Sequence, residues 1–164
     1  SFALHPGERV VLDGKNGSGK SSLLKVLLGE SIPHSGTITT SAGLVVSYVP
    51  QDTAHLNGLL SHFAEEHHLD ESLFKGILRK MGFERVQFEK KMEAFSAGQK
   101  KKVLLAASLC QPAHLYVWDE PLNFVDLHTR LQITSLLRQA QPTMLFVEHD
   151  RAFQEEIATQ KISL

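Results

Sequence analysis

The chain has 164 residues, of which 42% are hydrophobic and 21% charged, a composition that predicts one globular domain with a core and excludes an extensively disordered chain. Seventeen basic and eighteen acidic residues leave a net charge of −1, which by itself indicates neither a nucleic-acid nor a membrane partner. The single cysteine, Cys110, cannot form an internal disulfide and no apolar run approaches the length of a membrane span, so we expect a protein of a reducing compartment, the cytoplasm.

The first predicted element is a strand from Val10 to Leu12, which ends at a glycine-rich turn. After the turn, leucines at positions 23, 24, 27 and 28 recur at the spacing of one helix face. The turn itself, residues 14–21, reads GKNGSGKS and matches G-x-x-x-x-G-K-[ST] at every position, between a strand and a helix as that motif requires. The alternative, an ordinary glycine-rich turn, is disfavoured by this complete match, so the sequence predicts a phosphate-binding P-loop.

The residue types of the P-loop indicate how it would hold a nucleotide. Its backbone N–H groups and the N-terminus of the following helix attract phosphate. Lys20 should reach the β- and γ-phosphates, and the Ser21 hydroxyl should be a ligand of Mg²⁺. The predicted ATP-binding residues are Gly14, Asn16, Gly17, Ser18, Gly19, Lys20, Ser21 and Ser22.

The segment from residue 52 to residue 96 is more polar and has a helical pattern. We expect it to form a small helical subdomain, inserted into an α/β core made of residues 1–51 and 97–164. Its predicted apolar stripe has the spacing i, i+4, i+5 and i+8 and consists of Leu73, Ile77, Leu78 and Met81.

Two kinds of polar cluster in this region have an ordinary and a functional interpretation. His62, His67 and His68 could suggest a metal site, but no cysteine or suitable carboxylate accompanies them, so an exposed helix end is favoured. The lysine runs at 90–91 and 100–102 could contact an anionic partner, but short charge runs more often mark a solvated face, which is our prediction.

A second buried parallel strand is predicted from His114 to Glu120, because its apolar residues are continuous and do not alternate. We expect it beside the strand that leads into the P-loop, so that Asp119 holds Mg²⁺ through water. Glu120 would orient the attacking water or accept its proton. The alternative, an acidic pair that caps the next helix, is disfavoured by the P-loop. Trp118 and Cys110 are expected to lie in the core.

The last predicted elements are a helix and two strands. The helix should begin near Asp126 and end before Gln141, which precedes a proline. The strands are predicted at residues 143–149 and 161–164.

Three further motifs make the chain resemble the ATP-binding-cassette (ABC) ATPases. YVPQD (48–52) is similar to their Q-loop, FSAGQKKKVLLAASL (95–109) to their signature and its helix, and FVEHD (146–150) to their switch-histidine strand end. All five motifs follow the family's order from Gly7 to nearly the last residue. The resemblance implies a single ABC domain, 1–164, with a P-loop core, a mostly parallel sheet and an inserted helical subdomain. A cassette usually opens with two or three strands ahead of Gly7 and an aromatic residue that stacks on adenine, and we expect these strands to be missing.

The resemblance also implies roles for individual residues and the cofactors ATP and Mg²⁺. Gln51 would sense Mg²⁺ and the attacking water and serve as a metal ligand, His149 would contact the γ-phosphate, and Asp126 would belong to the D-loop. The signature residues would act on ATP held by a second cassette, in the same full-length chain or in a homodimer: Ser96, Gly98 and Gln99.

The signature departs from the family pattern at Ala97, where the family usually has glycine. The extra methyl group would stand where backbone approaches phosphate, and could alter affinity or rate. Gly98 is retained, so closure of two cassettes is not excluded. Because two head-to-tail cassettes share each site, we expect this chain alone to hydrolyse ATP poorly.

Residues after the acidic pair point to a branch of the family. LNFVD (122–126) places Asn123 where the Thr-Asn-His-Leu-Asp version of this segment has asparagine, which is typical of the ABC-F proteins, soluble tandem cassettes that bind ribosomes. EHDRAF (148–153) is similar to a run common in that group. Leu122 and Glu148 together resemble the antibiotic-resistance branch, which protects the ribosome from drugs.

This branch implies that an ATP-closed pair of cassettes sits in the tRNA exit site, that its interdomain linker dislodges the drug, and that hydrolysis releases the protein. The alternative is the nucleotide-binding subunit of a membrane transporter, whose partner is a transmembrane permease. A weaker third interpretation is a cassette that binds ATP only as a scaffold. In none of these does the chain itself insert into a membrane.

Overall fold

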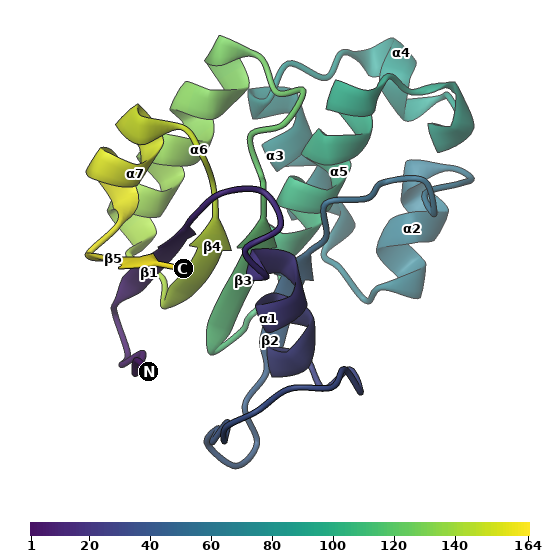
Figure 1. Ribbon diagram of the computed structural model, residues 1–164. Helices are drawn as coiled ribbons and strands as arrows, with labels where there is room; N and C mark the ends of the chain where they lie inside the picture. The colour runs from purple at the N-terminus through teal and green to yellow at the C-terminus, as the bar shows by residue number, and fades with distance from the viewer.

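A computed structural model describes residues 1–164 as a five-stranded parallel sheet with helices on both faces (Figure 1). The order of the strands across the sheet is β2-β3-β4-β1-β5. The predicted α/β fold with a mostly parallel sheet is therefore confirmed. The strands are β1 (Arg9–Asp13), β2 (Val46–Val49), β3 (Leu115–Asp119), β4 (Met144–Val147) and β5 (Gln160–Ser163).

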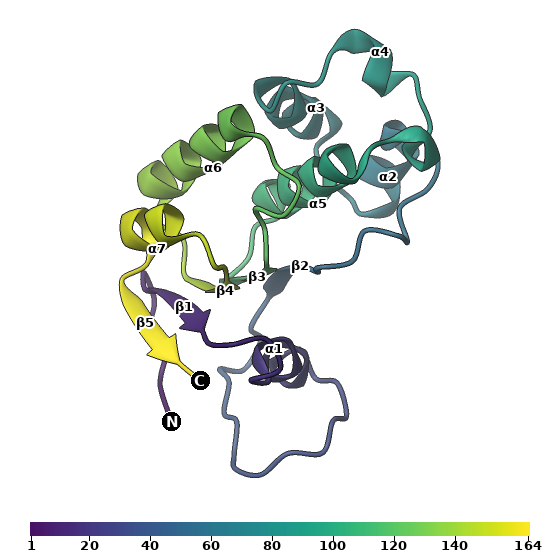
Figure 2. The ribbon, with the colours of Figure 1, turned by 45° about the horizontal axis from the view of Figure 1, so that its top comes forward.

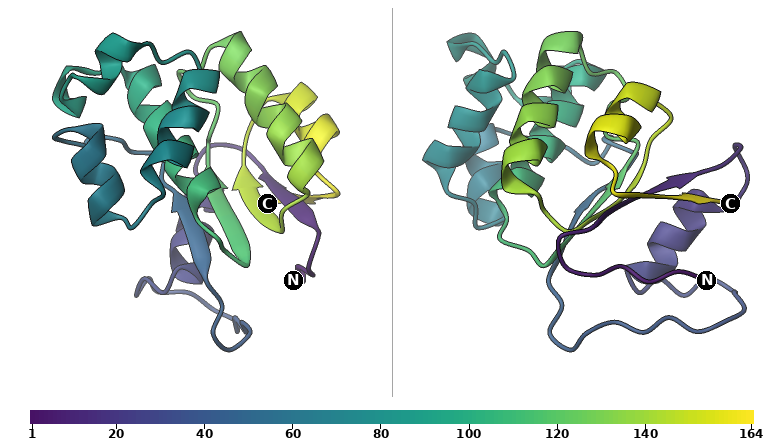
Figure 3. Two further views of the ribbon diagram at one scale, coloured as in Figure 1. Left: turned by 180° about the vertical axis from the view of Figure 1, so that it is seen from behind. Right: turned by 90° about the vertical axis from the view of Figure 1, so that its left-hand side faces the viewer.

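Seven α-helices and one 3₁₀ helix accompany the sheet (Figure 2). None of them is long and apolar enough to cross a membrane. The helix that follows the predicted turn, α1, lies on one face of the sheet, and α6 and α7 lie on the other (Figure 3). The helices are α1 (Lys20–Leu27), α2 (Leu60–Glu66), α3 (Glu71–Lys80), α4 (Arg85–Phe88), η1 (Met92–Ala94), α5 (Ala97–Cys110), α6 (Leu127–Ala140) and α7 (Arg151–Ile157).

The central strands β1, β3 and β4 are mostly apolar on both sides because both faces of the sheet are covered. Val11, Trp118 and Phe146 belong to the larger core, which includes residues of α5, α6 and α7. Their neighbours in sequence, such as Val10 and Val117, belong to the smaller core with Leu24 of α1. Continuous hydrophobicity therefore correctly predicted buried parallel strands, and Trp118 is fully buried as expected.

The predicted neighbourhood of two strands is wrong. We expected β3 beside β1, but β4 lies between them and pairs with both. Strand order is decided by the crossover connections, and the residues of one strand do not specify its neighbour in the sheet. Asp119 nevertheless reaches the loop after β1, because the carboxyl ends of all these parallel strands lie at one edge.

The helical segment between β2 and α5 corrects the predicted apolar stripe. Leu73 of α3 is 50% exposed, whereas its neighbour Phe74 is fully buried. The buried stripe is thus Phe74, Ile77, Leu78 and Met81, with the spacing i, i+3, i+4 and i+7 of one helix face. The N-cap explains where α3 starts, since the Asp70 carboxylate accepts a hydrogen bond from the Leu73 N–H.

Candidate nucleotide-binding and catalytic site

The P-loop joins the buried strand β1 to the N-terminus of α1. Gly19 is the N-cap of α1 and has φ 91°, and Gly17 has φ 85°, backbone conformations that glycine adopts without strain. The Lys20 ammonium donates to the Gly14 carbonyl, and the residue is only 6% exposed. The turn therefore brings backbone N–H groups and one buried cation together, the combination that attracts phosphate.

Asp119 contacts the start of α1 from the end of β3. The Ser21 hydroxyl donates to Asp119 Oδ2 over 3.0 Å, and the other carboxylate oxygen, Oδ1, is buried without a hydrogen-bond partner. Burial raises the pKa of Asp119, the Ser21 hydroxyl opposes this, and the nearby Glu120 charge adds to it. A hydroxyl beside a buried carboxylate with a free oxygen fits Mg²⁺, which prefers oxygen ligands.

Glu120 is the centre of a cluster at the carboxyl ends of three adjacent strands. Gln51, just after β2, donates its amide to Glu120 Oε2 over 2.7 Å. Asn123, in the loop after β3, donates to the same oxygen over 2.8 Å. His149, after β4, lies with Nε2 3.2 Å from Oε1. The structure thus brings together the three residues predicted to be catalytic, and a carboxylate held in this way can accept a proton from water.

Asn123 is a member of this cluster that residue-based reasoning missed. Its position indicated only a branch of the family, whereas its side chain directly contacts Glu120. Glu120 has φ 50°, an uncommon conformation for a non-glycine residue, and its N–H donates to the Val147 carbonyl over 2.8 Å. This backbone turn is what brings an asparagine three residues later back onto the carboxylate.

Glu148 is the second residue whose role was missed. It is 5% exposed, and its carboxylate accepts hydrogen bonds from the N–H groups of Leu122, His149 and Asp150. It thereby connects the loop after β3 to the end of β4. The available signal in the sequence was a glutamate within the predicted apolar strand 143–149, because a carboxylate buried there requires hydrogen-bond donors.

The predicted signature lies at the N-terminus of α5. Ser96 is the N-cap: its hydroxyl accepts from the Gln99 N–H over 3.1 Å, and the Gln99 side chain accepts from the Ser96 N–H over 3.0 Å. The Ser96 hydroxyl hydrogen stays available for a further acceptor. No hydrogen bond joins Ser96, Gly98 or Gln99 to the P-loop of the same chain, and Figure 2 shows this end of α5 apart from the loop before α1.

Gly98 contacts the loop that contains Asn123. A Cβ atom at this position would lie 2.5 Å from the Phe124 carbonyl oxygen, so the close approach requires glycine. Phe124 has φ 64° and is 76% exposed. Asp126, the predicted D-loop residue, ends this loop as the N-cap of α6, where its carboxylate accepts from the Thr129 N–H over 2.7 Å.

The prediction that lysines 100–102 are solvated is wrong for Lys102, whose side chain is 12% exposed and pairs with Asp126 over 2.6 Å, and above all for Lys101. It is 1% exposed, and its ammonium donates to the carbonyls of Pro50 and Gln51, both over 3.3 Å. Burial lowers the pKa of Lys101, while the Asp119 and Glu120 charges act in the opposite direction. The helix face was the missing information, since adjacent lysines on a helix point about 100° apart. Lys101 thus fastens Gln51 to α5.

A P-loop at the end of a buried strand, with two acids at the carboxyl end of another parallel strand of the same sheet, defines a P-loop nucleotide-binding protein. The family model described as "ABC transporter" matches residues 1–123, and the chain belongs to this family. Its ATPase domains bind ATP with Mg²⁺ and hydrolyse ATP.

Known proteins give a more specific comparison. The probable ATP-binding protein YbiT of Escherichia coli O157:H7 is 32% identical, over 100% of this chain and 32% of its own length. The ribosome protection protein VmlR of Bacillus subtilis (strain 168) is 30% identical, over 99% of this chain and 30% of its own length. These relatives are ABC-F proteins, so the resemblance to an ABC-F cassette is confirmed.

The fold has a solved counterpart. In the crystal structure of the complex of archaeal ribosomal stalk protein aP1 and archaeal ribosome recycling factor aABCE1, a chain with 27% identity matches 98% of this chain with a TM-score of 0.81. The match covers 32% of that chain. The chain therefore spans about a third of the length of the proteins that it resembles.

Proposed function

We propose that this chain is the ATP-hydrolysing cassette, by resemblance the C-terminal one, of a tandem-cassette ABC-F protein that acts on the ribosome in the cytoplasm and protects it from antibiotics. The contact of Gln51, Asn123 and His149 with Glu120 supports the hydrolytic part. The 30% identity to a ribosome protection protein over 99% of the chain supports the ribosomal part. A permease-coupled transporter subunit is the alternative.

The residues of the site divide the work of hydrolysis. Lys20 and the P-loop N–H groups bind the phosphates, and the Ser21 hydroxyl, with Gln51 and Asp119, holds Mg²⁺, which neutralises charge on the phosphate oxygens when bound. Glu120 accepts a proton from the attacking water. Gln51, Asn123 and His149 fix the carboxylate in place, so that little reorganisation is needed when the proton moves.

Substitution of Glu120 by Gln tests the hydrolytic part. The amide keeps the shape of the side chain but cannot accept the proton, so we expect ATP turnover to fall by at least ~100-fold. Binding of a fluorescent ATP analogue should be retained, because Lys20 and the P-loop are unchanged. Unchanged turnover would instead favour the scaffold-only interpretation.

A second cassette is the partner that the exposed surface fits. The signature at Ser96 makes no hydrogen bond to the P-loop of the same chain. The loop beside the signature exposes a large apolar side chain, Phe124. Leu127 and Leu131, one turn apart on α6, are 67% and 59% exposed. Three large apolar side chains are thus exposed on the loop that contacts Gly98 and on the helix that follows it, which supports head-to-tail pairing.

Co-sedimentation separates the ribosome factor from the transporter. The full-length protein carrying Glu120→Gln, with ATP, should pellet with ribosomes, because an ATP-bound pair cannot reopen by hydrolysis. The Lys20→Ala variant, which cannot bind the triphosphate, is the control and should stay in the supernatant. If the Glu120→Gln variant binds ATP but does not pellet, the ribosomal assignment is wrong.

A drug-susceptibility assay tests the protective role. Expression of the full-length protein in a susceptible strain should raise the inhibitory concentration of a drug that binds the peptidyl-transferase centre. Expression of the Lys20→Ala variant at the same level should not. Ribosome binding without any change in susceptibility would restrict the function to another ribosomal task.

A further inference from the structure

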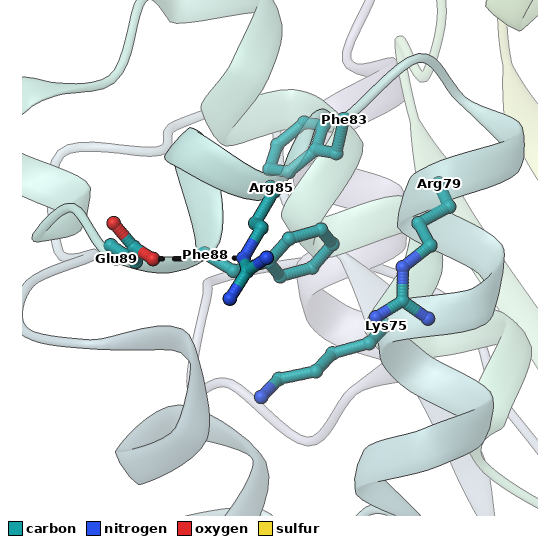
Figure 4. Close-up of a pocket in the computed structure, with 6 residues that line it drawn as sticks. All are labelled: Lys75, Arg79, Phe83, Arg85, Phe88 and Glu89. Carbon is teal, nitrogen blue, oxygen red and sulfur yellow. Dashed lines mark ion pairs between the residues drawn. The ribbon is translucent and has the colours of Figure 1, made fainter.

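A basic hollow lies on the helical segment, between α3 and α4 and outside the nucleotide site. It has a volume of about 430 Å³ (Figure 4). Lys75 and Arg79 reach into it from α3, and Arg85 from α4, around the ring of Phe88. The Arg79 guanidinium carbon is 5.2 Å and the Lys75 ammonium 5.9 Å from the centroid of this ring. Three cations thus surround one aromatic floor.

The charges of the hollow are only partly compensated within the chain. Lys75 pairs with Glu71 over 3.1 Å, and Arg85 lies 4.0 Å from Glu89. Arg79 has no ion-pair partner within 4.0 Å. The Arg85 side chain is 96% exposed, so its pair with Glu89 contributes little to stability.

The surrounding segment is basic in a chain that is not. Residues 75–91 contain six lysines and arginines and two glutamates, a net charge of +4, whereas the whole chain has a net charge of −1. Repulsion among these cations opposes folding, and the ion pairs of Lys75 and Arg85 offset it only in part, so a bound external anion would stabilise the segment further. The overall charge balance of the sequence conceals this concentration.

We propose that this hollow binds the phosphate backbone of RNA, so that the helical segment is an RNA-contacting surface of the ribosome factor. The inference rests on the proposed ribosomal function and names the chemistry that this surface contacts. Arginine presents a planar set of donors that matches phosphate oxygens, and two of the three cations of the hollow, Arg79 and Arg85, are arginines. Stacking over Phe88 orients Arg79 before binding, which lowers the entropy lost on contact.

The composition of the site favours phosphate over a base edge or an acidic protein. Phe83, the second aromatic residue, is 5% exposed and packed in the core, so one half-buried ring is available and no stacking platform for successive bases exists. A protein interface of this size would bring apolar contacts, whereas the rim here consists of charged side chains. Phosphate contacts without base readout predict binding that is sensitive to salt and insensitive to sequence.

The test measures binding of a fluorescein-labelled RNA duplex to the full chain by anisotropy, at several KCl concentrations. The variant is Arg79→Gln/Arg85→Gln. Because each lost phosphate contact reduces the salt slope by about one, we expect the slope to fall by about two and the affinity at low salt by at least ~10-fold. Circular dichroism should show an unchanged fold, since neither guanidinium is buried.

A matched control removes two arginines from the other side of the molecule. Arg138→Gln/Arg151→Gln acts on α6 and α7, where Arg138 lies 3.8 Å from Glu156 in a pair that is also on the surface. This control should retain the wild-type slope. Equal losses of RNA affinity and salt slope in both variants would mean that the effect comes from overall charge and would overturn the proposal. A wild-type slope in the Arg79/Arg85 variant would overturn it as well. If the Arg79/Arg85 variant loses binding to poly-glutamate but still binds RNA, the proposal is overturned and the partner of the hollow is an acidic protein.

Ribosome co-sedimentation distinguishes this proposal from the wider function. If the full-length protein pellets with ribosomes but the Arg79/Arg85 variant binds the RNA duplex normally, the ribosomal function stands and the hollow is not its RNA contact. If the protein does not pellet but the salt slope depends on Arg79 and Arg85, the hollow is an RNA site of a protein with another function.

Discussion

At the scale of single residues, the position of one carboxylate matters most. Glu120 can serve as a base only if its oxygens face the water, and three side chains from three different loops hold it there. Asn123 is the positioning residue closest in sequence, and it touches Glu120 rather than the P-loop. It should therefore affect the chemical step more than ATP binding.

Substitution of Asn123 by Ala is expected to lower kcat by roughly 10- to 100-fold, with little change in KM for ATP, because a misplaced Glu120 carboxylate is poorly aligned with the attacking water. Asn123→Asp has the same shape but no donor and should be at least as impaired. Steady-state ATPase kinetics check both. Full activity of Asn123→Asp would show that shape alone is needed and that the hydrogen bond is not.

Asp126 gives a prediction about pH. Burial raises the pKa of this carboxyl, but hydrogen bonds from Lys102, over 2.6 Å, and Thr129 outweigh it and lower the pKa from 3.8 to about 2. The folded state therefore favours the ionised form. Its stabilising contribution is complete above about pH 4 and is lost as the pH falls towards 2.

Asp126→Asn keeps an N-cap for α6 but removes the charge. Wild type should exceed this variant in unfolding free energy by up to ~1 kcal/mol near neutral pH, since the carboxylate is half exposed and partly screened. Urea unfolding at a series of pH values should show this difference shrinking below about pH 4. A difference that grows on acidification would contradict the assignment.

At the scale of elements, α5 organises the site from its N-terminal half. Its N-cap is the signature serine, Gly98 packs on the loop of Phe124, and Lys101 binds the carbonyl of Gln51. One helix therefore contacts two of the loops that carry the residues around Glu120. A shift of this helix should therefore displace both loops.

Gly98→Ala tests this coupling. The added methyl would lie 2.5 Å from the Phe124 carbonyl oxygen, so we expect the free energy of unfolding to fall by roughly 1–3 kcal/mol, because the obstructing atom belongs to the backbone. The matched control is Gly76→Ala in α3, where a Cβ meets nothing within 4 Å. The control should be neutral or stabilising, because alanine favours a helix. Similar results for both would disprove the close contact.

At the scale of the whole molecule, the separation of signature and P-loop predicts a shared site. In a head-to-tail pair of two copies of this cassette, each P-loop would work with the Ser96 of the other copy. Each half therefore depends on the other, and two different defects placed in different chains should complement each other.

Lys20→Ala removes the phosphate contact of one site half, and Ser96→Asp retains a good N-cap but places a negative charge beside the partner's phosphates. We expect each variant alone to be nearly inactive and an equimolar mixture to recover up to about a quarter of the wild-type rate. Half of the pairs in the mixture are mixed pairs, and each of these has one intact site out of two. ATPase assays of the mixture at several protein concentrations check this. A mixture as inactive as its components would argue against the cross-chain site.

Features that depend on residues close together in the chain could be predicted from the amino-acid sequence alone. The P-loop is one, because a strand, a glycine-rich turn and a helix in succession place the backbone around a phosphate. The helix starting after Asp126 is another, because an N-cap acts within its own turn. The α/β class followed from buried strands and helical stripes, and the family from five motifs in order.

Contacts between residues far apart in the chain could be known only from the packing of the folded molecule. Packing placed β4 between β3 and β1 and buried Lys101 against the loop after β2. It also buried Phe74 where the sequence pattern had predicted Leu73. One residue's step turns a helix face by about 100°, so a periodic pattern alone leaves its phase open. The contact of Gln51 and His149 with Glu120 joins residues 69 and 29 positions apart, and depends on three strands ending at one edge of the sheet. Local chemistry could name these side chains, but only packing could bring them together.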